Sequence, residues 1–150
     1  MNRLHHSLLG FALAMVPVPG FAQQSSIVGA WEPTAYVLES GTSHAVDGRI
    51  FFTDIDWTVL FFVSDGDGLK RGSAEGGTYT TDGDELVFAH RFHLSVGEEM
   101  EGMPASALRM EMRPVGEATL EASTFNVEGD GMTLFFPSGN RMEFRRASSF

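Results

Sequence analysis

The sequence predicts an all-β protein, and three observations support this prediction. Apolar residues after position 24 alternate with polar ones or run in short blocks, as strand residues do. Clusters of Gly and Asp, such as residues 81–84 and 129–131, separate these blocks at intervals of about 8–15 residues and suit hairpin turns. No stretch keeps a convincing helical period over three turns. An antiparallel sheet of short, consecutive strands is therefore expected.

Nine runs of residues qualify as strands, and hairpin-length segments separate most of them. They cover residues 27–38, 49–53, 57–63, 77–81, 86–95, 107–114, 118–127, 132–136 and 141–146. Such a series favours a single up-and-down antiparallel β-barrel of about eight strands, with one run split or lying outside it.

Residues 1–22 have the pattern of a cleaved secretory signal peptide. Arg3 precedes an apolar run over residues 8–16, and a small residue, Ala22, ends the segment. Pro17 interrupts the run well short of the roughly 20 residues that a membrane-spanning helix needs. We therefore expect a periplasmic or secreted protein without a membrane anchor, with residues 23–150 forming one domain.

Composition limits how this domain is held together and what it binds. The chain has no cysteine, so an exported form is stabilised without disulfides. Its formal net charge is −10 at pH 7, and such a surface repels nucleic acids and anionic lipid surfaces. Neither is expected as a partner.

Strand parity predicts which side chains face inward, because successive strand residues point to opposite faces. In residues 108–113, Leu108, Met110 and Met112 form the apolar face and the charged residues form the other. In residues 86–94 the even positions are apolar apart from His90, which we expect to face inward with them. In the last run, Arg146 shares a face with Met142 and Phe144.

Two short motifs near the ends of the domain carry a family resemblance. Gly29-Ala30-Trp31 opens the first run and Arg146 lies at the end of the last. Together with residues 77–87 and the final hairpin at 131–141, they resemble small bacterial lipocalin-like domains of the calycin group. The resemblance implies that Gly29, Trp31 and Arg146 close one end of the barrel, where a guanidinium can stack on an indole ring. Trp31 as an ordinary core aromatic is the alternative.

The resemblance also implies a barrel that often holds a small hydrophobic molecule. Eight strands enclose a space that is either filled by side chains or hollow enough for one small ligand, and the sequence leaves both open. The expected lining residues are Phe52, Phe61, Tyr79, Phe88, His90, Met110, Met112 and Phe125.

Other functions remain as alternatives. His90 either hydrogen-bonds within the core or orients a ligand. A copper-type metal site using histidines and methionines is the second candidate, although His90 and His93 share a face only if a bulge separates them. A filled barrel that contacts another exported protein is the third. No nucleophile or phosphate-binding motif is present, so an enzyme is not favoured; no cofactor and no catalytic residue is expected.

Overall fold

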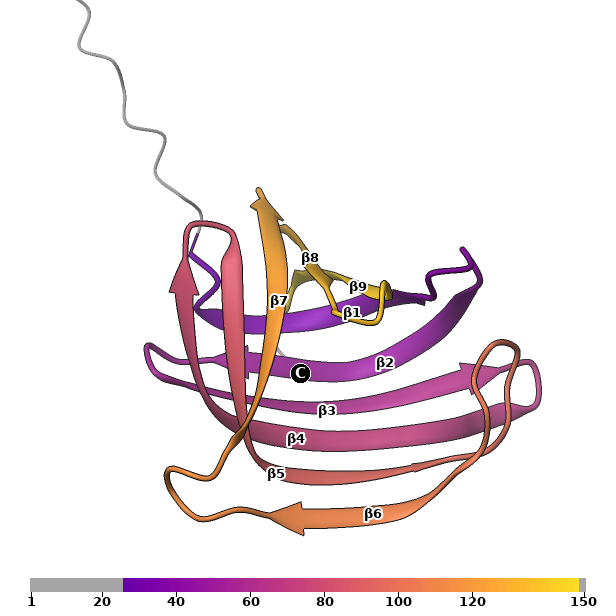
Figure 1. Ribbon diagram of the computed structural model, residues 1–150. Coiled ribbons are helices and arrows are strands. Elements are labelled where there is room, and N and C mark those ends of the chain that lie inside the picture. The colour runs from indigo at the N-terminus through magenta and orange to yellow at the C-terminus, as the bar shows by residue number, and fades with distance from the viewer. Residues whose placement is uncertain (1–25, 149–150) are drawn as a thin grey trace, which may run out of the picture.

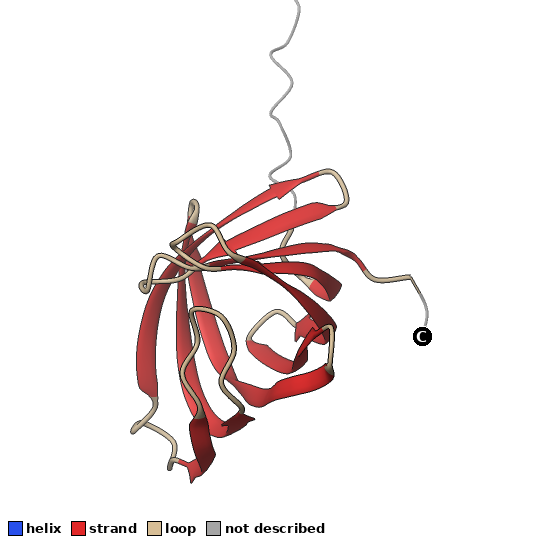
Figure 2. Ribbon diagram, turned by 90° about the vertical axis from the view of Figure 1, so that its right-hand side faces the viewer, coloured by secondary structure: helices blue, strands red, loops and turns tan. Residues whose placement is uncertain are grey.

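The structure is a computed structural model that describes residues 26–148, and the predicted fold class is confirmed. This part of the chain consists of strands and loops without a helix (Figure 2). It contains nine strands: β1 (Gly29–Val37), β2 (Ser43–Phe52), β3 (Asp56–Asp65), β4 (Gly68–Asp82), β5 (Glu85–Gly97), β6 (Ser106–Met112), β7 (Thr119–Glu128), β8 (Gly131–Phe135) and β9 (Arg141–Arg146). The predicted signal peptide lies outside the described residues. No helix among them is long and apolar enough to cross a membrane.

Eight of the nine strands close into an antiparallel barrel. Hydrogen-bonded neighbours follow the order β4-β3-β2-β1-β9-β8-β7-β5-β6, and β4 also pairs with β5, which closes the ring. Strand β5 pairs with β7 through Glu85 to His90 and with β6 through Phe92 to Gly97. Figure 1 shows β6 at the edge of the sheet beyond β5. We call β6 together with residues 92–97 of β5 the extension.

A bulge in β5 separates the barrel wall from the extension. Gly76 is opposite Phe92 and Gly77 is opposite His90, so Arg91 is an extra residue in β5. A Cβ on Gly77 would lie 1.9 Å from the Ala89 carbonyl oxygen, so only glycine allows this close approach. The extra residue reverses the alternation of side chains along β5.

The reversal corrects the parity predicted for residues 92–112. Before the bulge, Leu86 and Phe88 are buried as expected; after it, Phe92 and Leu94 are exposed. Strand β6 pairs with the reversed segment, so Met110 and Met112 are 71% and 84% exposed. The expectation that these two methionines face the barrel interior is wrong, because the sequence pattern does not show the bulge.

One end of the barrel is closed by Trp31 and Arg146, which are opposite each other on β1 and β9. The Arg146 guanidinium carbon lies 3.8 Å from the centre of the Trp31 ring, and its nitrogens donate to the carbonyl oxygens of Val28 (2.7 Å) and Ser26 (2.5 Å). The Trp31 Nε1–H donates to the Ile27 carbonyl oxygen, 2.7 Å away. Trp31 is fully buried.

Gly29 is required at this end for two reasons. Its φ is +129°, a region that residues with a side chain rarely adopt. A Cβ there would lie 2.7 Å from Arg146 Nη1. The glycine therefore makes room for the arginine that covers Trp31.

Candidate functional site

A cavity of about 340 Å³ lies inside the barrel and receives side chains from every barrel strand. Its volume is at the lower end of the range of small-molecule sites. Most of the wall is apolar: Ile50, Trp57, Val59, Phe61, Val63, Phe88, Val96, Leu134, Phe136 and Met142. The barrel is therefore not completely filled by its side chains.

The structure divides the predicted lining residues into three groups. Phe61, Phe88 and His90 line the cavity. Phe52, Tyr79 and Phe125 belong instead to the packed closed end: Phe52 and Phe125 are buried, and the rings of Phe52 and Tyr79 meet edge to face at 5.2 Å. Met110 and Met112, the third group, border a groove on the outer surface.

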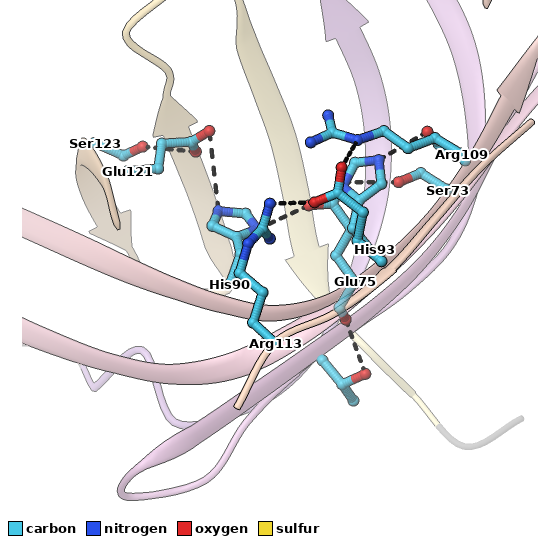
Figure 3. A network of polar contacts seen from close by, with 11 residues as sticks. Ser73, Glu75, His90, His93, Arg109, Arg113, Glu121 and Ser123 are labelled. Carbon is cyan, nitrogen blue, oxygen red and sulfur yellow. Dashed lines mark hydrogen bonds and ion pairs between the residues drawn. The ribbon is translucent and has the colours of Figure 1, made fainter. Parts of the chain in front are cut away.

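Glu75 joins the polar residues of the cavity into one cluster (Figure 3). Its Oε2 lies 2.8 Å from His90 Nδ1 and 3.1 Å from His93 Nδ1, and its Oε1 accepts a 2.8 Å hydrogen bond from the Ser73 hydroxyl. Both histidines reach one carboxylate because the Arg91 bulge turns His93 to the face that His90 occupies. Glu75 lies on β4, directly opposite His93.

The Glu75 carboxylate is held in its charged form. Burial alone raises the pKa of this group, but the hydrogen bonds from His90 and Ser73 and the charges of His93 and His90 outweigh burial and lower the pKa to about 2. The cavity wall therefore carries a carboxylate at every physiological pH. Because Glu75 accepts from His90 Nδ1, that nitrogen carries a proton.

Two nitrogens beside the cavity are buried without a hydrogen-bond partner among the described residues. They are Trp57 Nε1 and His90 Nε2, and the two rings meet edge to face with centres 5.0 Å apart. Glu121 Oε2 lies 4.0 Å from His90 Nε2, which is beyond hydrogen-bond distance. An unsatisfied buried polar atom costs about 1–3 kcal/mol, so this part of the wall is not optimised for stability alone.

The inner face of the extension is also polar. Glu111 pairs with Arg109 (Nε–Oε1 2.5 Å) and with Arg113, the residue after β6. The Arg109 and Arg113 side chains lie beside the Glu75 cluster (Figure 3). The hydrogen bond from Arg109 and the positive charges around it lower the pKa of Glu111. Charges thus face inward in the extension, whereas the barrel wall buries apolar residues.

The cluster places one carboxylate and two imidazoles beside a mostly apolar cavity. In the described residues, no group of three or more histidine, aspartate or glutamate side chains could hold a metal ion. The Glu75–His90 pair orients an imidazole, but Nε2, which would meet a substrate, is closed off from the cavity surface. The arrangement fits a binding site with one polar patch.

Sequence reasoning missed Glu75, Ser73, Trp57 and Val59 as cavity residues. Glu75 and Ser73 lie in residues 68–76, the first half of β4, where glycines and charged residues interrupt the alternation typical of a strand. Trp57 and Val59 lie in a run that is apolar on both faces, so parity does not select them. Comparison of the chain with protein-family models, curated proteins and solved structures found no match.

Proposed function

We propose that this protein is an exported, lipocalin-like β-barrel of the calycin group that binds one small, mostly apolar molecule inside the barrel. The cavity carries the proposal: about 340 Å³ of space is bordered mainly by aromatic and aliphatic side chains. Removing apolar surface from water is the dominant force for binding in such a site.

The polar cluster limits the kind of molecule that fits. Glu75 stays charged because its pKa is about 2, and Glu121 also borders the cavity. Both disfavour a ligand carboxylate or phosphate placed beside His90. Arg71, the cation at the cavity wall, already has hydrogen-bond partners within the protein. Its Nη1 donates to the carbonyl oxygens of Glu98 (2.7 Å) and Pro104 (2.8 Å). The charges therefore disfavour an anionic ligand, and the mostly apolar lining favours an uncharged one.

The export part of the proposal rests on the signal-peptide pattern of residues 1–22. A barrel held by packing alone, with no cysteine in the chain, is compatible with an oxidising compartment. Membership of the calycin group rests on the Gly29, Trp31 and Arg146 arrangement and on the eight-stranded barrel that it closes.

A fluorescence titration with 1-aminoanthracene, a neutral aromatic dye that brightens in apolar surroundings, tests binding. We expect saturable one-to-one binding by the wild-type protein. Val59→Phe places a larger side chain in the cavity and is expected to weaken binding by roughly tenfold or more, which is about 1.4 kcal/mol.

The neighbouring residue supplies a matched control. Leu60 is 48% exposed on the other face of β3, so Leu60→Phe adds the same ring outside the cavity and is expected to leave binding unchanged. Binding that responds equally to both substitutions, or no saturable binding by a folded wild-type protein, would contradict the proposal.

A further inference from the structure

Strand β6 leaves one edge of the sheet without a neighbouring strand among residues 26–148. It pairs only with β5 and stands last in the strand order. Natural edge strands are usually protected by charged side chains, proline, a β-bulge or a covering segment. Strand β6 has the sequence Ser-Ala-Leu-Arg-Met-Glu-Met, which contains no proline, and its two charged residues have opposite signs, so a second copy can pair with them rather than be repelled. Its edge is open to pairing with another strand.

The backbone groups on this edge belong to Leu108, Met110 and Met112. Arg113 N donates to the Arg91 carbonyl oxygen at 2.7 Å, and hydrogen-bonded pairs alternate along an antiparallel ladder. From Arg109 to Arg113, where the pairing with β5 has no register shift, the odd-numbered residues therefore turn their N–H and C=O groups toward β5. The even-numbered residues turn theirs outward.

The side chains of the same three residues are apolar and exposed. Leu108, Met110 and Met112 are 59%, 71% and 84% exposed. They continue an apolar outer surface that includes Phe92 and Leu94 of β5. Apolar patches of this kind on soluble proteins mark interaction sites.

The sequence of β6 is complementary to itself in one antiparallel register. When Met110 is opposite Met110 of a second copy, Leu108 is opposite Met112 and Arg109 is opposite Glu111. All outward backbone groups then meet partners of the second copy, and opposite charges lie in the close, non-hydrogen-bonded pairs. The two neighbouring registers that also use the outward groups place Arg109 opposite Arg109, or Glu111 opposite Glu111.

We propose that the chain forms a two-fold symmetric dimer through antiparallel pairing of β6 with β6 of a second copy, centred on Met110. The sheet then continues from one barrel into the other. The contact is isologous, as in most homodimers. Because only Leu108 to Met112 of each β6 are paired in this register, the interface is small, and the dimer is weak and depends on concentration.

Sedimentation velocity over micromolar to millimolar concentrations tests the dimer with protein expressed from the full sequence. We expect a reversible monomer–dimer equilibrium. Met110→Pro removes the central N–H and is expected to leave a monomer at every concentration. Arg109→Glu places two carboxylates opposite each other twice per dimer and is expected to weaken association by about tenfold.

Exchanging the charges of residues 109 and 111 distinguishes this pairing register from other contacts between the two copies. The double variant Arg109→Glu/Glu111→Arg restores opposite charges across the two-fold axis and is expected to recover the wild-type dissociation constant to within about threefold. Arg141→Glu is the matched control, because Arg141 pairs with Glu143 at the same spacing on β9, which is paired on both sides. It is expected to leave the dimer unchanged.

Three results would overturn the proposal, provided that circular dichroism shows each variant to be folded. They are a wild-type monomer at all concentrations, a dimer that survives Met110→Pro, and a double variant no better than Arg109→Glu alone. The last two would indicate a contact elsewhere on the apolar outer surface.

Discussion

The barrel wall and the extension both consist of antiparallel strands, but their apolar side chains lie on opposite faces. The apolar face points inward in the wall and outward in the extension. In the wall, apolar side chains such as Leu134 and Met132 face inward and are almost fully buried. In the extension, Arg109 lies beside the Glu75 cluster (Figure 3) and pairs with Glu111, while Met110 and Met112 are exposed on the other face. One additional residue in β5 produces this difference, because it reverses the faces of the side chains that follow it, from Phe92 to Leu94.

The comparison separates stability from function in this molecule. The closed end of the wall is packed by aromatic rings and covered by Arg146. At the bulge, packing gives way to a cavity, unsatisfied nitrogens and a charged cluster. We infer that the closed end of the wall supplies most of the free energy of unfolding, and that the region around the bulge adds the polar groups to the proposed binding site, whose apolar lining comes from the wall.

The largest expected effect is at the closed end. Trp31→Ala removes a fully buried indole and is expected to lower the free energy of unfolding by about 3–5 kcal/mol. Urea denaturation followed by circular dichroism measures this loss. A loss below about 1 kcal/mol would show that Trp31 is not a main support of the wall.

The next effect is a pH dependence at the boundary between the two regions. The pKa of Glu75 falls from an ordinary 4.5 to about 2 in the folded protein, so its stabilisation is complete above pH 4.5 and is lost as the pH falls toward 2. The difference corresponds to about 3 kcal/mol. Urea midpoints measured across this range are expected to fall less steeply in Glu75→Gln than in the wild type.

Glu117, an exposed glutamate in the loop after β6, provides the control for this pH series. Glu117→Gln is expected to keep the wild-type profile. If Glu75→Gln shows the same acid loss as the wild type, the cluster does not hold Glu75 as a stabilised carboxylate.

The smallest expected effect is that of an exposed methionine of the extension, Met112, measured against a buried methionine of the wall, Met132. Met132 in β8 is 2% exposed and Met112 in β6 is 84% exposed. Met132→Ala is expected to cost about 2–5 kcal/mol, and Met112→Ala less than about 0.5 kcal/mol at concentrations where the chain is monomeric. Similar losses in the two variants would indicate that the extension is packed like the wall.

Local sequence patterns were sufficient for the strand count and for the closed end. The nine expected runs correspond to nine strands, with β6 as the one outside the barrel. The shared face of Met142, Phe144 and Arg146 placed the arginine, rather than Arg145, over Trp31. These features depend on turns and on alternation within single strands, which sequence shows directly.

The candidate site could not be predicted from the alternation of polar and apolar residues along single strands. A bulge becomes visible only when two strands are paired, so the meeting of His90 and His93 at Glu75 was not predictable from β5 alone. The same holds for Asp47-Gly48, which looks like a turn but lies within β2. There Gly48 passes so close to β3 that a Cβ would lie 1.9 Å from the Leu60 carbonyl oxygen.

A crystal structure of the protein with 1-aminoanthracene tests the central claim most directly, because the two regions offer competing apolar sites. The account predicts that the dye lies inside the barrel, against Phe61 and Phe88. A dye bound instead in the outer groove beside Leu94, Met110 and Met112, with the barrel interior empty, would contradict it.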